Sequence, residues 1–145
     1  MKTKCLRVVL CLMVIFGIVL VHISCDPTKG IIMGKVKYQG QPCASAYVLL
    51  LAENELITGN QPLGNGSITL GDGSYTIINV TPDTYYYVVA VKDINGDIKY
   101  TPGVDAMGYY GSYDGFSWIP TSVIVSAGQT LTGIDIGELY VIPVP

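Results

Sequence analysis

The sequence predicts an all-β protein, a single β-sandwich that follows an N-terminal signal segment. Half of the 145 residues are hydrophobic and only 13% are charged, and residue types that favour strands are abundant, including 11 tyrosines. These residues fall into short runs separated by turn signals rich in Gly, Pro, Asn and Asp, at the spacing typical of a sandwich. No stretch after the signal has the apolar period of an amphipathic helix.

The signal segment covers residues 1–24. Three basic residues lie within the first seven positions, an apolar run follows over 8–21, and Ser24 precedes Cys25. This run is shorter than the ~20 apolar residues that a membrane-spanning helix needs. The layout resembles a bacterial lipoprotein signal, in which the cysteine after the cleavage site carries the lipid, although His22 stands where such signals have an apolar residue. The resemblance implies export and lipidation at Cys25.

Cleavage after residue 24 would change the chemistry available to the protein. It removes the only histidine and the only arginine, and leaves five lysines against eleven acidic residues, a formal charge of −6. This balance disfavours nucleic acid as a partner and provides no basic patch for anionic lipid. Without histidine, there is no Ser–His or Cys–His nucleophile pair and no His-ligated zinc. We therefore expect no enzymatic activity.

Two cysteines remain after the expected cleavage, and one of them is the lipidation site. Cys43 is then alone, so the domain cannot contain an internal disulfide. Because no histidine, arginine or second thiol can activate it, we expect Cys43 to be a buried and inert thiol. Residues 25–29 form a short tether, and the domain occupies 30–145.

The first expected strand covers 31–38. Ile32, Val36 and Tyr38 share one of its faces, while two lysines point to the other. A turn follows at 39–42, where proline fixes one φ angle and glycine can adopt a positive one.

The later strands follow the same logic. The run 46–52 is apolar on both faces, as in a central strand covered on both sides, and it precedes a polar loop over 53–66. The run 74–80 alternates, and 85–92 has the strongest β-propensity in the chain. The remaining expected strands lie at 67–70, 121–126, 131–136 and 139–142.

Three segments carry a family resemblance: GKVKYQGQPCASAYVLLLA, GDGSYTIINVTPDTYYYVVAVKDINGD and IVSAGQTLTGIDIGEL. Together they resemble the carboxypeptidase regulatory-like domain, a prealbumin-like (transthyretin-like) β-sandwich, over about 30–139. The resemblance implies a seven-stranded Greek-key sandwich, with Tyr75 and Ile77 in its core. It does not imply one activity, because such domains serve several functions. Asp83 stands where the family usually has glycine, and Asp tolerates the positive φ angle that this turn needs.

The segment after residue 92 contains oxygen side chains at alternating positions. Such oxygens are the ligands that Ca²⁺ prefers, although the spacing departs from that of an EF-hand. One interpretation is a calcium site in a sandwich loop. The alternative is a plain hairpin turn at Asn95-Gly96 with solvated aspartates around it. The candidate ligands are Asp93, Asn95, Asp97, the Lys99 carbonyl and Asp105.

Aromatic residues are concentrated in the glycine-rich stretch 100–118. Exposed aromatic rings can stack on sugars, so this stretch is a candidate carbohydrate-binding surface. The alternative is a lid of irregular backbone that folds over the open end of the sandwich. The candidate ligand-binding residues are Tyr109, Tyr110, Tyr113 and Trp118.

Together these features predict an exported lipoprotein of the bacterial cell envelope, anchored to a membrane by its lipid and facing the periplasm or the exterior. Its sandwich is expected to be structural or to bind a ligand, without catalysis. The alternative function is a carbohydrate-binding module that uses the aromatic stretch 100–118 and is ordered by calcium. Expected partners are the membrane, through the lipid, and a glycan or an envelope protein.

Overall fold

The computed structural model describes residues 28–52 and 65–143, so the signal segment, Cys25 and most of the loop 53–66 lie outside the described residues. Within these ranges the chain forms strands and no helix, and hence no helix that could cross a membrane. The strands are β1 (Gly30–Lys35), β2 (Lys37–Tyr38), β3 (Gln41–Pro42), β4 (Tyr47–Leu51), β5 (Gly66–Ile68), β6 (Ser74–Val80), β7 (Tyr86–Lys92), β8 (Ala106–Tyr109), β9 (Gly111–Tyr113), β10 (Trp118–Pro120), β11 (Ser122–Val123), β12 (Thr130–Leu131) and β13 (Tyr140–Val141).

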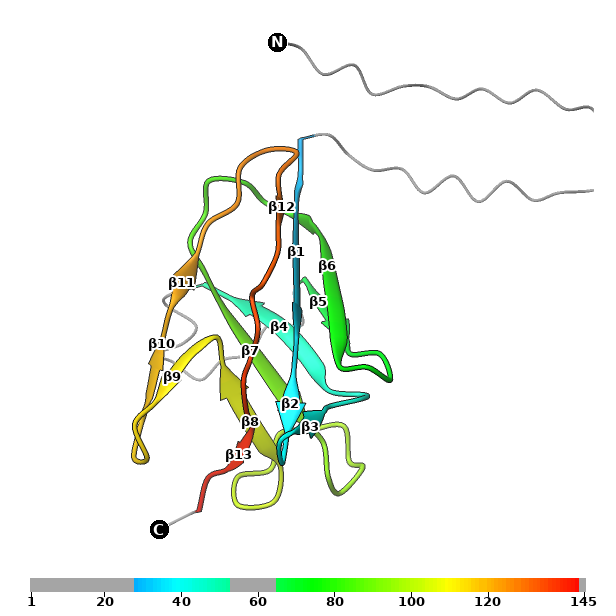
Figure 1. The fold of residues 1–145 in the computed structure, drawn as a ribbon, viewed down its shortest axis with the longest axis vertical. Helices are drawn as coiled ribbons and strands as arrows, with labels where there is room; N and C mark the ends of the chain where they lie inside the picture. Colours follow the sequence, from blue (N-terminus) through cyan, green and yellow to red (C-terminus); the bar gives the residue numbers. More distant parts are fainter. Residues whose placement is uncertain (1–27, 53–64, 144–145) are drawn as a thin grey trace, which may run out of the picture.

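Two sheets form the body of the molecule (Figure 1). The larger has the order β13-β8-β7-β4-β5, with β11 paired to β7, and the smaller has the order β12-β1-β6. All pairs in the larger sheet are antiparallel, whereas β1 pairs with β12 in parallel and with β6 in antiparallel orientation. The architecture confirms the all-β prediction and is consistent with a β-sandwich.

The core lies between the two sheets and matches the alternation read from the sequence. Ile32 and Val36 are fully buried, and Tyr38 packs against the same cluster. Tyr75 and Ile77 of β6 are buried in that cluster too, as the resemblance implied. From the larger sheet the cluster receives one face of β4 and β7, namely Val48, Leu50, Val88 and Ala90.

Gly40 and Asp83 adopt the positive φ angles expected of them, but Gln41 and Pro42, expected in the first turn, form β3. Gln39 and Gly40 both have positive φ angles, 53° and 73°, and form the two-residue turn between β2 and β3. Positive φ at both positions matches the twist of a tight hairpin. Asp83 has a φ angle of 55°, so the aspartate takes the left-handed conformation that glycine would adopt more easily.

The chain between residues 93 and 120, where no strand was expected, contains the three strands β8, β9 and β10. β8 lies inside the larger sheet between β7 and β13, and β9 pairs with β10 in a separate hairpin. The prediction of a plain hairpin turn at Asn95-Gly96 is also wrong, because a long loop, 93–105, joins β7 to β8. The C-terminal strands are much shorter than expected; Ile136, for example, forms only an isolated bridge with Val36.

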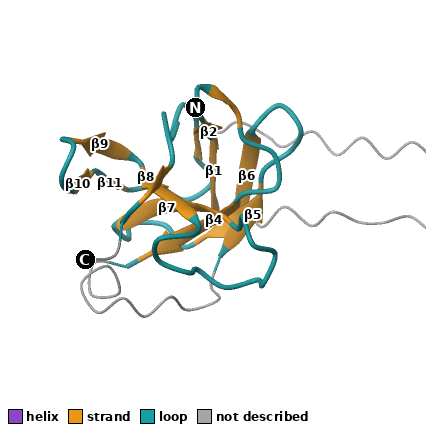
Figure 2. Cartoon of the chain, turned by 90° about the horizontal axis from the view of Figure 1, so that it is seen from below, coloured by secondary structure: helices purple, strands orange, loops and turns teal. Residues whose placement is uncertain are grey.

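The β9–β10 hairpin stands apart from the two layers. Figure 2 shows it projecting from one side of the sandwich. Figure 1 shows two opposite ends of the molecule: β1 begins at the upper end, while loop 93–105 and the β2–β3 turn lie at the lower end.

Candidate functional site

Loop 93–105 is organised around a buried carboxylate. Asp105 has no exposed surface, and its two carboxylate oxygens accept hydrogen bonds from the backbone N–H groups of Ile94 (2.8 Å) and Thr101 (2.7 Å). A buried carboxylate needs such donors, because burial removes its hydration. Asp105 therefore ties the start of the loop to its end.

Two further aspartates hold the turn inside this loop. Asp93 accepts hydrogen bonds from the backbone N–H groups of Gly96 (2.6 Å) and Ile98 (2.9 Å). Asp97 accepts one from the backbone N–H of Lys99 (2.9 Å), and this bond is the main cause of a lowered pKa of the Asp97 carboxyl. Hydrogen bonds to the charged form of a carboxyl favour that form.

The structure brings three of the predicted calcium ligands together. One carboxylate oxygen from each of Asp93, Asp97 and Asp105 lies within 4.8 Å of the other two. Asn95 is adjacent, since its side-chain amide donates to Asp97 (3.0 Å). Lys99 donates its backbone N–H to Asp97 and directs its side chain into a neighbouring pocket. Three negative charges at this separation repel one another, so the cluster has the chemistry to hold a hard divalent cation.

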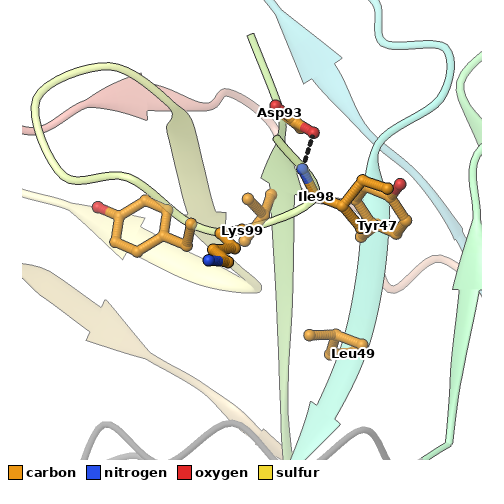
Figure 3. A pocket seen from close by; sticks show the side chains of 7 residues that line it. Tyr47, Leu49, Asp93, Ile98 and Lys99 are labelled. Carbon is orange, nitrogen blue, oxygen red and sulfur yellow. Dashed lines mark hydrogen bonds between the residues drawn. The ribbon is translucent and has the colours of Figure 1, made fainter. Parts of the chain in front are cut away.

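The neighbouring pocket lies between the loop and the outer face of β4 and β7 (Figure 3). It has a volume of about 130 Å³ and a mainly apolar lining. Ile98 and Tyr47 both line it, and the φ angle of Ile98, 61°, is strained for a β-branched residue. The sequence did not predict this pocket, because its lining is distant in the chain: Tyr47, Leu49, Val91, Asp93, Ile98, Lys99 and Tyr100.

The second candidate site is an aromatic cluster built from four strands. The Tyr113 ring packs against those of Trp118 and Tyr140, with ring centroids 4.9 Å and 4.5 Å away and interplanar angles of 40° and 31°. Tyr109 meets Trp118 edge to face at 5.8 Å. These distances and tilts are those of packed aromatic pairs, so the rings form an aromatic wall that is not a flat platform.

The cluster differs in membership from the sequence prediction. Tyr110 is not part of it, because its side chain packs against the core of the sandwich. Tyr140, which the sequence did not suggest, joins from β13. The expected irregular lid is instead a hairpin whose tip carries Phe116, 95% exposed. Asp114 closes that tip by accepting hydrogen bonds from the backbone N–H groups of Phe116 and Ser117, both at 2.8 Å.

A groove of about 190 Å³ runs beside the aromatic wall. Glu138 lines it, and the Glu138 carboxylate accepts hydrogen bonds from the backbone N–H groups of Gln39 and Gly40 in the β2–β3 turn. Burial raises the pKa of the Tyr109 hydroxyl, which stays protonated at neutral pH. The indole N–H of Trp118 is buried without a hydrogen-bond acceptor in the described part of the chain. The lining residues are Tyr109, Gly111, Tyr113, Trp118, Gly137, Glu138 and Tyr140.

The Cys43 thiol does not belong to either candidate site. Cys43 is buried in the core cluster, and this burial is the main cause of a raised pKa of its thiol. A raised pKa lowers the fraction of thiolate, which is the reactive form. The structure therefore gives Cys43 a packing role.

Comparisons with known proteins give a fold-level neighbour and no family. No protein-family model matches the sequence, and no curated protein matches it. Among solved structures, the chain is similar to a DUF3823 family protein from Parabacteroides merdae, with 18% sequence identity and a TM-score of 0.37. The match covers 79% of this chain and 47% of the neighbour, so this chain spans about half the length of that β-rich bacterial protein.

Proposed function

We propose that this chain is an exported lipoprotein of the bacterial cell envelope, whose prealbumin-like β-sandwich is a non-catalytic binding module. The lipoprotein-like signal before Cys25 supports the anchor, and the sequence resemblance over 30–139 supports the prealbumin-like assignment. The observation that carries the proposal is the placement of the two candidate sites relative to the start of β1.

A lipid at Cys25 would orient the domain. Gly30 is five positions after Cys25, a distance of at most ~18 Å when the chain is fully extended. The end of the sandwich where β1 begins would therefore face the membrane. Loop 93–105 and the β2–β3 turn, which Glu138 joins to the aromatic groove, lie toward the opposite end (Figure 1). Both sites would then be open to a ligand outside the membrane.

The chemistry of the domain supports binding without catalysis. Residues 30–145 contain no histidine and no arginine. The Cys43 thiol is buried, and the carboxylates of Asp105 and Glu138 accept backbone hydrogen bonds. Without a histidine to act as its base, the buried thiol does not form a nucleophile and base pair.

Metabolic labelling tests the anchor. A palmitate analogue should label the wild-type protein expressed in a bacterium with lipoprotein processing, and should not label the Cys25→Ala variant. Cys43→Ala is the matched control, because Cys43 is the other cysteine beyond the signal, and it should be labelled like the wild type. Equal labelling of wild type and Cys25→Ala would contradict the lipoprotein proposal.

Two ligand classes fit the two sites. The aromatic groove favours a carbohydrate, because it combines aromatic rings with the Glu138 carboxylate. The cluster of Asp93, Asp97 and Asp105 favours calcium, which would compensate three neighbouring negative charges and order the loop. Calcium would then act as a structural ion at the same end of the domain and take no part in a reaction.

A further inference from the structure

The aromatic groove is formed by segments far apart in the sequence. β9 and β10 supply Tyr113 and Trp118, while the chain around β13 supplies Glu138 and Tyr140. The Trp118 and Tyr140 ring centroids lie 5.7 Å apart, so the hairpin and the C-terminal segment are in direct contact. The groove is thus part of the fold and does not depend on a single mobile loop.

The shape of the aromatic wall limits what can bind. Neighbouring rings are tilted by 31° to 62°, so they do not present one flat face. A wall of tilted rings suits one small ring better than the flat face of an extended polymer. The rings also contact one another at 4.5–5.8 Å, so they leave no hollow between them that could surround an ammonium group.

The polar group at the groove selects the charge of the ligand. Glu138 is the charged residue of the lining, which contains no lysine. A carboxylate accepts hydrogen bonds, so it favours a ligand that carries hydroxyl groups. An acidic ligand would place a second carboxylate beside Glu138, and like charges at close range repel.

We propose that this groove binds a single neutral pyranose residue, with an apolar face of the sugar ring against the aromatic wall and a hydroxyl group donating to Glu138. The inference rests on the proposed role as a binding module and adds its ligand class and the residues that select it. The Glu138 charge disfavours acidic sugars, and the closed packing of the rings leaves no aromatic cage for a quaternary ammonium group.

The fluorescence of Trp118 measures ligand binding at the groove, because Trp118 is the only tryptophan of the chain. The full-length protein in detergent is titrated with methyl glycosides of neutral hexoses and N-acetylhexosamines, with methyl glucuronide, and with tetramethylammonium. At least one neutral glycoside should produce a saturable change in Trp118 fluorescence, and methyl glucuronide should bind at least tenfold more weakly than its neutral counterpart. The absence of a saturable change with every neutral glycoside would overturn the proposal, as would equal or tighter binding of methyl glucuronide or of tetramethylammonium.

A bulky side chain at Gly137 tests the groove without disturbing the fold. Gly137 lines the groove, and a Cβ atom added there meets no other atom within 4 Å. Gly137→Leu should therefore leave the thermal melt unchanged and weaken glycoside binding at least tenfold. Gly71→Leu is the matched control, because Gly71 is equally open but lies in the β5–β6 turn, and its binding should equal that of the wild type. Wild-type binding by Gly137→Leu would overturn the proposal.

Glu138→Gln tests the charge selection. This variant should lose most of the preference for the neutral glycoside over methyl glucuronide, and an unchanged preference would overturn the role of Glu138. Because Glu138 also holds Gln39 and Gly40, the melt of the variant is recorded alongside. The labelling of Cys25 is independent of all these results, so failure of glycoside binding and failure of the anchored-module proposal are distinguishable.

Discussion

Individual buried hydroxyl groups hydrogen-bond to backbone groups beyond the ends of the strand ladders. The Tyr75 hydroxyl donates a hydrogen bond of 2.6 Å to the carbonyl oxygen of Ile134, which links β6 to the chain that follows β12. Thr69 instead extends the pairing of β4 with β5, because its hydroxyl donates to the Cys43 carbonyl and accepts from the backbone N–H of Ala46. Each of these partners would be left unpaired if the hydroxyl were removed.

Tyr75→Phe should lower the free energy of unfolding by about 1–3 kcal/mol, because it leaves the Ile134 carbonyl without its side-chain donor in a buried site. Urea denaturation of the wild type and the variant measures the change. Tyr85→Phe is the matched control, since the Tyr85 side chain is 63% exposed and its loss of a hydroxyl should change stability by less than about 0.5 kcal/mol. Equal stability of Tyr75→Phe and the wild type would show that the hydrogen bond contributes nothing.

Features of single residues are predictable from the sequence where neighbouring residues in the chain cause them. Alternation identifies the buried face of 74–80. The turn pattern of the family that the sequence resembles identifies the positive φ angle of Asp83. Alternating oxygens likewise place Asp93 and Asp97 close together. Glu138 and Tyr140 could not be found in this way, because they reach the groove only through the pairing of β13 with β8.

At the scale of strands, β8 shows why a central strand can be missed. Its sequence, Ala-Met-Gly-Tyr, has weak β-propensity, and the neighbouring glycines suggest irregular backbone. The reason for a small residue appears only in the fold: a Cβ atom on Gly108 would lie 2.6 Å from the carbonyl oxygen of Glu138. Gly108 thus permits the close approach that brings the Glu138 segment to the aromatic wall.

Loop 93–105 is the element whose order is expected to depend on an ion. Calcium that binds the cluster of Asp93, Asp97 and Asp105 in the folded state alone would stabilise it by about 1.4 kcal/mol at tenfold excess over Kd. For a domain of this size, that corresponds to a rise in Tm of roughly 5 °C relative to a chelator. Thermal melts with calcium and with EDTA measure the difference.

A matched pair of variants assigns the effect to this loop. Asp97 and Asp72 are both exposed turn aspartates that accept hydrogen bonds from nearby residues, but only Asp97 belongs to the cluster. Asp97→Asn should reduce the calcium-dependent rise in Tm, and Asp72→Asn should retain it. Identical melts of the wild type in calcium and in EDTA would refute a calcium site here.

At the scale of the whole molecule, the two ends of the sandwich have different roles in the proposed function. The upper end in Figure 1 holds the start of β1 and would face the membrane, and the lower end holds loop 93–105 and the β2–β3 turn. The projecting hairpin carries the exposed Phe116 side chain, which could itself enter a bilayer if it faced one. A short tether from Cys25 to the start of β1 favours an orientation in which the hairpin lies in the aqueous phase and not in the bilayer.

The single tryptophan distinguishes these orientations. In liposomes that contain lipids brominated on their acyl chains, bromine quenches tryptophan only at contact range. Trp118 of the lipidated protein should be quenched no more than Trp118 of the Cys25→Ala variant in the same liposomes, because the anchor holds the hairpin away from the bilayer. Phe116→Ser should leave this result unchanged. Strong quenching that Phe116→Ser abolishes would mean that the hairpin inserts into the membrane, which would place the aromatic groove at the lipid surface and not at the ligand-facing end.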